Sequence, residues 1–202
     1  MTLMNLSQAK VSRHMEILQS FDTLGFLTTS QVQQLHNLGG RRNTTRILSD
    51  MAEYLSSFFL DEKVYYLNAH GRKTIGSTTI RRRTIQIHHT LIRNQVYVRF
   101  RPTELWKPEH VIKWDDKQLV TDATFRLNGQ YVFLEVDVTQ PMAANERKIE
   151  LYRELRESGR WQQKYGVFPS ILYVTVSEYR QKRLRAIMGD LKAEVLTVAD
   201  VK

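Results

Sequence analysis

The 202-residue sequence contains no cysteine. Disulfides, thiolate zinc sites and a cysteine nucleophile are therefore excluded. No run approaches the roughly 20 apolar residues that a membrane span requires. Residues 1–10 also lack the apolar core of a secretory signal peptide, so we expect a cytoplasmic protein with no membrane partner. The hydrophobic fraction of 42% and the charged fraction of 25% are typical of a folded protein with one or two small domains.

Acidic residues are scarce in one half of the chain only. Residues 1–102 contain 14 Lys and Arg against 6 Asp and Glu, a net charge of +8, whereas residues 103–202 contain 16 and 15, a net charge of +1. This asymmetry favours a polyanionic partner for the first half, because neutralising phosphates releases counterions and supplies affinity that is independent of base sequence. A generically basic surface is the alternative.

The first half has the element order of a winged helix-turn-helix. Three successive segments within residues 12–55 carry apolar residues at helical spacing, which predicts three short helices. Two β-prone runs, 58–60 and 64–67, follow them and predict a hairpin. We therefore expect a winged helix-turn-helix domain over residues 9–78.

Basic and polar residues gather where the third of these helices begins. In a winged helix-turn-helix this helix enters the major groove, and its first residues meet the base edges. Arginine suits guanine, asparagine suits adenine, and threonine suits phosphates. The expected partner is double-stranded DNA. One alternative is a winged helix that contacts only protein. For Arg81, Arg82 and Arg83, the alternative is the solvated start of a helix. The predicted DNA-binding residues are Arg41, Arg42, Asn43, Thr44, Thr45, Arg46, Lys63, Arg72, Lys73, Arg81, Arg82 and Arg83.

The second half, residues 79–202, has the pattern of a small α/β domain with a mixed sheet. A helical segment over residues 85–100 is followed by three strands and then by helix, strand, helix and strand. Asn128-Gly129 joins the second and third strands and is the strongest short-range hairpin signal in the chain. The continuous apolar run 171–176 predicts a central strand.

Three carboxylates are predicted to lie on one face of that sheet. Glu135 and Asp137 are two residues apart on one strand and therefore share a face. A hairpin centred on Asn128-Gly129 places Asp122 opposite Glu135 on the neighbouring strand. The three side chains would repel one another without a cation, and a hard cation such as Mg²⁺ suits them as ligands, with Lys148 on the next helix as a nearby positive group. Surface carboxylates paired with arginines are the alternative.

Several short motifs follow one another along most of the chain. They are the winged-helix segment, Tyr66-Leu67-Asn68-Ala69-His70-Gly71, His89-Thr90-Leu91 with Asn94, Asp122-Ala123, Phe133-Leu134-Glu135-Val136-Asp137, Lys148 and Tyr152. In this order and spacing the chain resembles the replication-relaxation family of bacterial plasmids, conjugative elements and phages. The resemblance implies a DNA-binding protein of a mobile element that acts as an accessory or regulatory factor in replication, DNA relaxation or transcription.

The resemblance also implies a second domain like the PD-(D/E)XK fold of restriction endonucleases. The active site of that superfamily has an aspartate and then Glu-x-Lys on the next strand. Asp122 and Glu135 match the first two positions, but Asp137 stands where the lysine helps to activate the attacking water. In an active enzyme the three carboxylates would hold Mg²⁺, and Lys148 would replace the missing lysine. We favour a degenerate nuclease fold used for binding or dimerisation; the alternative is a metal-dependent endonuclease or nickase directed by the winged helix.

The expected assembly is a homodimer, because paired half-sites are the usual way in which such DNA-binding modules gain affinity. Other replication or transfer proteins are further expected partners. A third reading is an adaptor whose winged helix binds protein.

Overall fold

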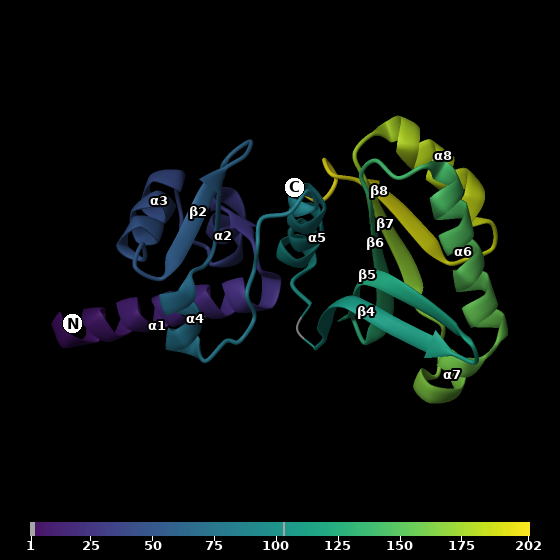
Figure 1. The fold of residues 1–202 in the computed structure, drawn as a ribbon, viewed down its shortest axis with the longest axis horizontal. Helices are drawn as coiled ribbons and strands as arrows, with labels where there is room; N and C mark the ends of the chain where they lie inside the picture. The colour runs from purple at the N-terminus through teal and green to yellow at the C-terminus, as the bar shows by residue number, and fades with distance from the viewer. Residues whose placement is uncertain (1–2, 103) are drawn as a thin grey trace. The chain divides into compact units, whose positions relative to one another are not determined.

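The computed structural model describes residues 3–102 and 104–202, with side chains from residue 8 onward. It divides into two compact units, Met1–Asn94 and Gln95–Lys202, each with its own sheet (Figure 1). No helix within the described ranges is both long and apolar enough to cross a membrane. The first unit contains α1 (Leu3–Leu24), β1 (Leu27–Thr28), α2 (Thr29–Leu35), α3 (Arg41–Asp50), β2 (Leu55–Phe59), β3 (Lys63–Leu67), α4 (Ala69–Ile75) and the start of α5 (Ile87–Phe100).

The first unit has the predicted winged helix-turn-helix order. Its antiparallel sheet has the strand order β1-β3-β2, and β2 and β3 form the expected hairpin. The apolar stripes of the three helices are buried, as Phe21, Val32 and Ile47 illustrate. The two-residue strand β1 was not predicted, because so short a run carries no periodicity.

The exit from the wing is built around one glycine. The Asn68 side chain caps α4 by accepting a 2.9 Å hydrogen bond from the Gly71 amide. A Cβ at position 71 would lie 2.2 Å from the Tyr54 carbonyl oxygen. Only glycine therefore lets α4 approach the chain before β2 so closely, which gives the motif at residues 66–71 a structural reason.

The division between the units falls inside α5 and not after residue 78, where the sequence led us to expect a boundary. The reason is that the start of α5 packs on the winged helix. Ile87 joins Phe26 in a small apolar cluster. The Asn94 amide donates to the carbonyl oxygens of Leu24 and Phe26 at 2.8 and 2.7 Å.

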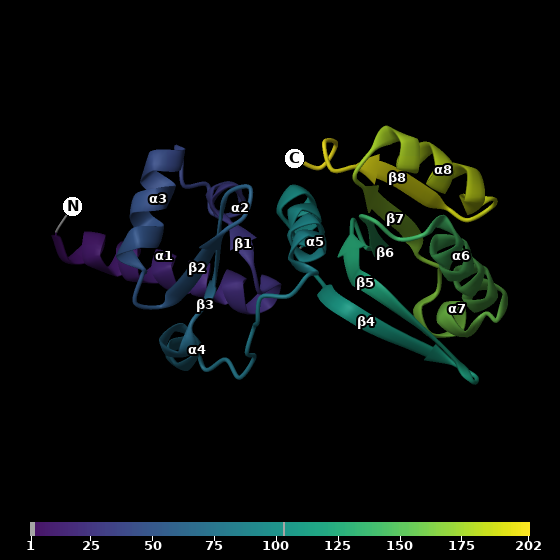
Figure 2. The ribbon, with the colours of Figure 1, turned by 45° about the horizontal axis from the view of Figure 1, so that its top comes forward.

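The second unit is a mixed five-stranded sheet with the order β4-β5-β6-β7-β8. Strands β4, β5 and β6 are antiparallel, whereas β6, β7 and β8 are parallel, as the predicted mixed sheet requires. Three helices cover one face of it (Figures 1 and 2). The unit contains the rest of α5, β4 (Trp106–Trp114), β5 (Lys117–Leu127), β6 (Gln130–Asp137), α6 (Met142–Glu157), α7 (Arg160–Tyr165), β7 (Ser170–Thr175), α8 (Glu178–Met188) and β8 (Ala193–Thr197).

The hairpin between β5 and β6 has the predicted turn and register. Asn128 and Gly129 have φ values of +50° and +76°, the left-handed conformation that a two-residue turn of this type demands. Pairing runs from Leu127 opposite Gln130 to Ala123 opposite Leu134. Asp122 therefore follows directly after the last pair of the ladder.

Strand β4 forms one edge of the sheet and contains two irregular positions. Pro108 lies within the strand. Glu109 follows with a φ of +49°. An edge strand tolerates proline because one side of its backbone needs no ladder hydrogen bonds.

Candidate functional site

Helix α3 presents a basic and polar face to solvent. Arg42, Thr45 and Arg46 are exposed and lie within one turn of one another. The opposite side of the helix is buried through Ile47 and Leu48. The arrangement leaves the exposed face free to enter a groove, as the DNA-binding hypothesis requires.

Thr44 was wrongly assigned to this face. Its side chain is fully buried, and its hydroxyl donates to the Gly40 carbonyl oxygen at 3.3 Å. The signal for this was in the sequence, because positions 44, 48 and 51 lie on one side of a helix and the last two are Leu48 and Met51. Thr44 therefore belongs to the packing of α3 and not to its exposed face.

Two other predicted residues at the start of α3 are partly occupied within the protein. Arg41 forms a 3.1 Å ion pair with Glu62 and also donates to the Ser30 hydroxyl. Asn43 donates to the Leu38 carbonyl oxygen at 2.9 Å. These contacts hold the beginning of α3 against α2 and the wing.

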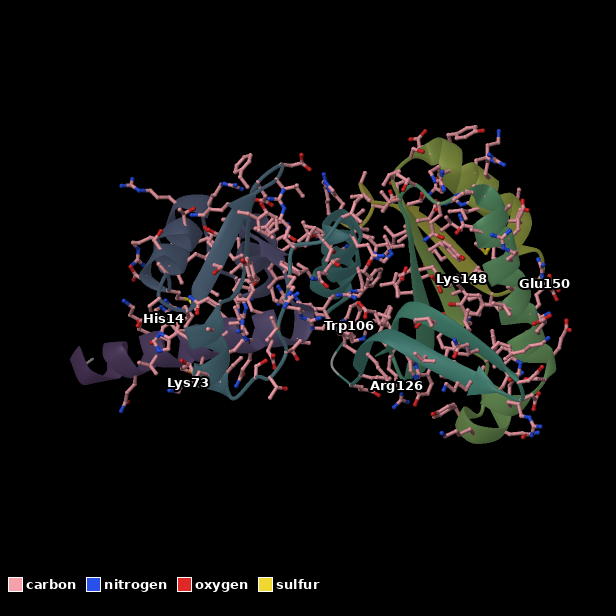
Figure 3. The ribbon with its side chains drawn as sticks, in the orientation of Figure 1. His14, Lys73, Trp106, Arg126, Lys148 and Glu150 are labelled. Atoms are coloured by element: carbon pink, nitrogen blue, oxygen red, sulfur yellow. The ribbon has the colours of Figure 1, made fainter. Side chains whose placement is uncertain are left out.

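The cations around the wing have different surroundings. Lys63 is exposed at the start of β3, and Lys73, labelled in Figure 3, is exposed on α4. Arg72 is half-buried and donates to the Leu67 carbonyl oxygen at 3.2 Å, so it stabilises the end of β3.

The three arginines before α5 lie in three different environments. The Arg81 side chain packs against Gly25 at the end of α1. Arg83 places its guanidinium 4.7 Å from the centre of the Phe58 ring on β2, which brings it to the wing. Arg82 is exposed.

A buried carboxylate lies at the centre of the second unit. Glu135 on β6 is 2% exposed and accepts hydrogen bonds from the Lys148 ammonium and the Tyr152 hydroxyl, both on α6. Lys148 is labelled in Figure 3. The carboxylate of Asp122 accepts a 2.6 Å bond from the Val136 amide, where the β5–β6 ladder has ended. The structure thus brings Asp122, Glu135 and Lys148 together as the sequence predicted.

Asp137 has a separate set of partners on the same face. The Arg180 guanidinium donates to both carboxylate oxygens, from Nε at 2.6 Å and from Nη2 at 2.7 Å. Asn145 and the Thr175 hydroxyl add bonds of 3.0 Å each. Burial would raise the pKa of Asp137, but the bonds from Arg180, Asn145 and Thr175 together hold it below its ordinary value.

Each of the three carboxylates, for which the sequence offered Mg²⁺ as one partner, has a partner within the protein. Both oxygens of Asp137 are engaged by Arg180, so this side chain offers no open ligand position. Within residues 3–102 and 104–202, no three His, Asp or Glu side chains are grouped as a metal ion needs. A cationic side chain neutralises Asp137 and another contacts Glu135, but both carboxylates are buried, so they are not the surface residues of the alternative reading.

Burial also decides the charge of Glu135. It raises the pKa of Glu135 to about 8, although the Lys148 ammonium acts in the opposite direction. Tyr173 on β7 pairs with Glu135 in the sheet register and is also buried. Its hydroxyl has no hydrogen-bond partner in the described part of the chain. Sequence spacing did not predict this tyrosine, because the register of β7 against β6 depends on a crossover of about 30 residues.

Comparison with known proteins shows the family of the chain and finds distantly similar solved structures. Residues 18–171, most of the chain, match the model of the family described as replication-relaxation. No curated protein matches the sequence. The crystal structure of protein VC1899 from Vibrio cholerae is similar with a TM-score of 0.37 and 12% identity, over 80% of this chain and 40% of that chain. On the family match, which confirms the resemblance of the motifs, the chain belongs to the replication-relaxation family.

Proposed function

We propose that the protein binds double-stranded DNA through α3 and acts as an accessory or regulatory factor in the replication, relaxation or transcription of a bacterial mobile element. The observation that carries this proposal is the exposed face of α3, with Arg42, Thr45 and Arg46 on a winged helix-turn-helix. The family description supports the connection with replication and relaxation.

The contacts around α3 support a division of roles. Arg41 and Asn43 are bonded to α2, the wing and the turn before α3, so they position the helix. Arg42 forms no ion pair within the described residues and remains available to a guanine edge. Lys63 at the wing suits a phosphate of the neighbouring backbone.

The second unit supports binding more than cleavage. Asp137 stands at the lysine position of the nuclease motif and is neutralised by Arg180. We propose that this unit mediates dimerisation or contact with other replication or transfer proteins. One contact, between Lys148 and Glu135, favours the nuclease alternative. Incubation with supercoiled plasmid and Mg²⁺ tests it: nicking that disappears in Glu135→Gln would establish an enzyme, and an intact plasmid at DNA-saturating protein would exclude one.

The DNA-binding proposal is tested with Arg42→Ala. We expect weaker binding to DNA from the element's own origin by about 1–3 kcal/mol, with a smaller difference between specific and scrambled duplexes. Fluorescence anisotropy at fixed salt measures both quantities. Lys182→Ala is the control, because Lys182 is exposed on α8 of the second unit. If Arg42→Ala and Thr45→Ala both bind like this control, α3 does not read the DNA.

A further inference from the structure

A second group of cations lies beside the DNA-facing surface of α3. Helices α1 and α3 enclose a hollow of about 170 Å³ in the first unit. His14, which lines it, is labelled in Figure 3. The charged or titratable residues that line it are Lys10, Arg13, His14, Arg46 and Asp50.

Asp50 is the one carboxylate among these lining residues, and two cations share it. The Lys10 ammonium lies 2.9 Å from Oδ2 of Asp50, and Nη1 of Arg46 lies 3.7 Å from the same oxygen. The hydrogen bond from Lys10 and the positive charges around it lower the pKa of Asp50. Asp50 therefore acts as an internal counter-ion that holds Lys10 and Arg46 at the hollow.

The hollow keeps a positive charge after this pairing. Arg13 forms no ion pair within the described residues, so the cations at the hollow outnumber its single carboxylate. Burial lowers the pKa of His14, and the charge of Lys10 acts in the same direction, while Asp50 opposes the shift. A site of this kind suits an anion larger and more exposed than the Asp50 side chain.

We propose that a backbone phosphate of the DNA held by α3 enters this hollow and replaces Asp50 as the partner of Lys10 and Arg46, with Arg13 as an additional contact. The proposal rests on the proposed function. DNA is the occupant favoured by position, because Arg46 belongs both to this hollow and to the exposed face of α3, one turn after Arg42. The contact would fix the position of α1 on the duplex without reading bases.

Removing a cation from the hollow and removing its carboxylate should change DNA affinity in opposite directions. Each phosphate neutralised by the protein steepens the fall of log K with log salt by about 0.9. Arg13→Ala should therefore weaken binding to specific and scrambled duplexes by the same factor and reduce the slope by about 0.9. Asp50→Asn removes the competing anion and keeps the side-chain shape, so it should strengthen binding to both duplexes and steepen the slope.

The experiment measures anisotropy of both duplexes over a series of salt concentrations with the full chain. Glu16→Gln is the matched control for Asp50→Asn, because Glu16 is an exposed acid on α1 that does not line the hollow. Circular dichroism melting checks that each variant is folded. If Asp50→Asn does not fold, Lys10→Ala replaces it in the test. Like Arg13→Ala, Lys10→Ala should weaken binding to both duplexes.

The two proposals fail in different ways. If the unmodified protein does not bind DNA, or if Arg42→Ala and Thr45→Ala both bind like Lys182→Ala, the proposed function is wrong and the proposed phosphate site is wrong with it. If Arg42→Ala weakens binding while Asp50→Asn changes it no more than Glu16→Gln, and Arg13→Ala leaves the slope intact, then α3 binds DNA and the hollow does not hold a phosphate.

Discussion

The guanidinium of Arg180 on α8 donates two parallel hydrogen bonds, of 2.6 and 2.7 Å, to the carboxylate of Asp137 on β6. In the PD-(D/E)XK motif that the resemblance of the sequence implies, lysine stands at the position of Asp137. A positive charge does reach this place, but it comes from a helix 43 residues later and neutralises a carboxylate. The ion pair connects α8 to the sheet, and its removal should lower the free energy of unfolding.

Replacing Arg180 by leucine should destabilise the second unit by about 3 kcal/mol, because the Asp137 carboxylate would be left buried without its cation. Denaturation in urea, followed by tryptophan fluorescence, measures the change. Lys182→Leu is the control, since Lys182 is exposed on the same helix. Equal stability of the two variants would show that the ion pair contributes nothing net.

Glu135 should make the stability depend on pH. Its pKa is 4.5 in an ordinary environment and about 8 in the fold, so the folded state binds the proton more tightly than the unfolded state does. The contribution from this group is therefore complete below pH 4.5 and decreases as pH rises to about 8. Thermal unfolding of Glu135→Gln should lose this part of the pH dependence.

The control for this prediction is Asp190→Asn. Asp190 is exposed and paired with Arg156, so its pKa lies below the ordinary value and its titration falls at lower pH. The profile of Asp190→Asn between neutral and mildly alkaline pH should match that of the unmodified protein. A Glu135→Gln profile with the same slope as both would contradict the raised pKa.

Gly71→Ala should destabilise the winged helix by about 3 kcal/mol, because the new Cβ would meet the Tyr54 backbone at 2.2 Å and the chain must shift. Gly40→Ala is the matched control. Gly40 has an ordinary φ of −82° and no atom within 4 Å of a new Cβ. A smaller loss for Gly71→Ala than for Gly40→Ala, measured by chemical denaturation, would refute the close approach.

Asn94→Leu should cost about 2 kcal/mol, since the buried carbonyl oxygens of Leu24 and Phe26 would lose their donor. Gln95→Met is the neighbouring comparison, because Gln95 is half-buried and donates to the Val201 carbonyl oxygen. We expect Asn94→Leu to lose more stability than Gln95→Met. A larger loss for Gln95→Met in urea denaturation would be inconsistent with the burial of Asn94.

The sequence predicted what depends on neighbouring residues. Asn128-Gly129 defined the turn, the turn defined the register, and the register placed Asp122 beside Glu135. The winged-helix order followed from helical periodicity and the hairpin signal. These features share a short range, within which spacing determines geometry.

The sequence did not predict what depends on distant elements. Nothing in the spacing links Asp137 to Arg180 or Tyr173 to Glu135, because both contacts depend on how a crossover helix returns the chain to the sheet. The prediction for Thr44 was wrong for another reason. Its residue type suggested a phosphate contact, whereas its position on the helix indicated the core. The helical position should have taken precedence.

Pro108 and Glu109 on β4 also bear on how the protein behaves in concentrated solution. An exposed edge strand invites a strand of another molecule to pair with it. Here the proline offers no N–H, and the positive φ of Glu109 bends the backbone out of the extended line. At the opposite edge, the Thr197 amide on β8 already donates to Asp200. Both borders of the sheet are thus poor templates for aggregation by strand addition.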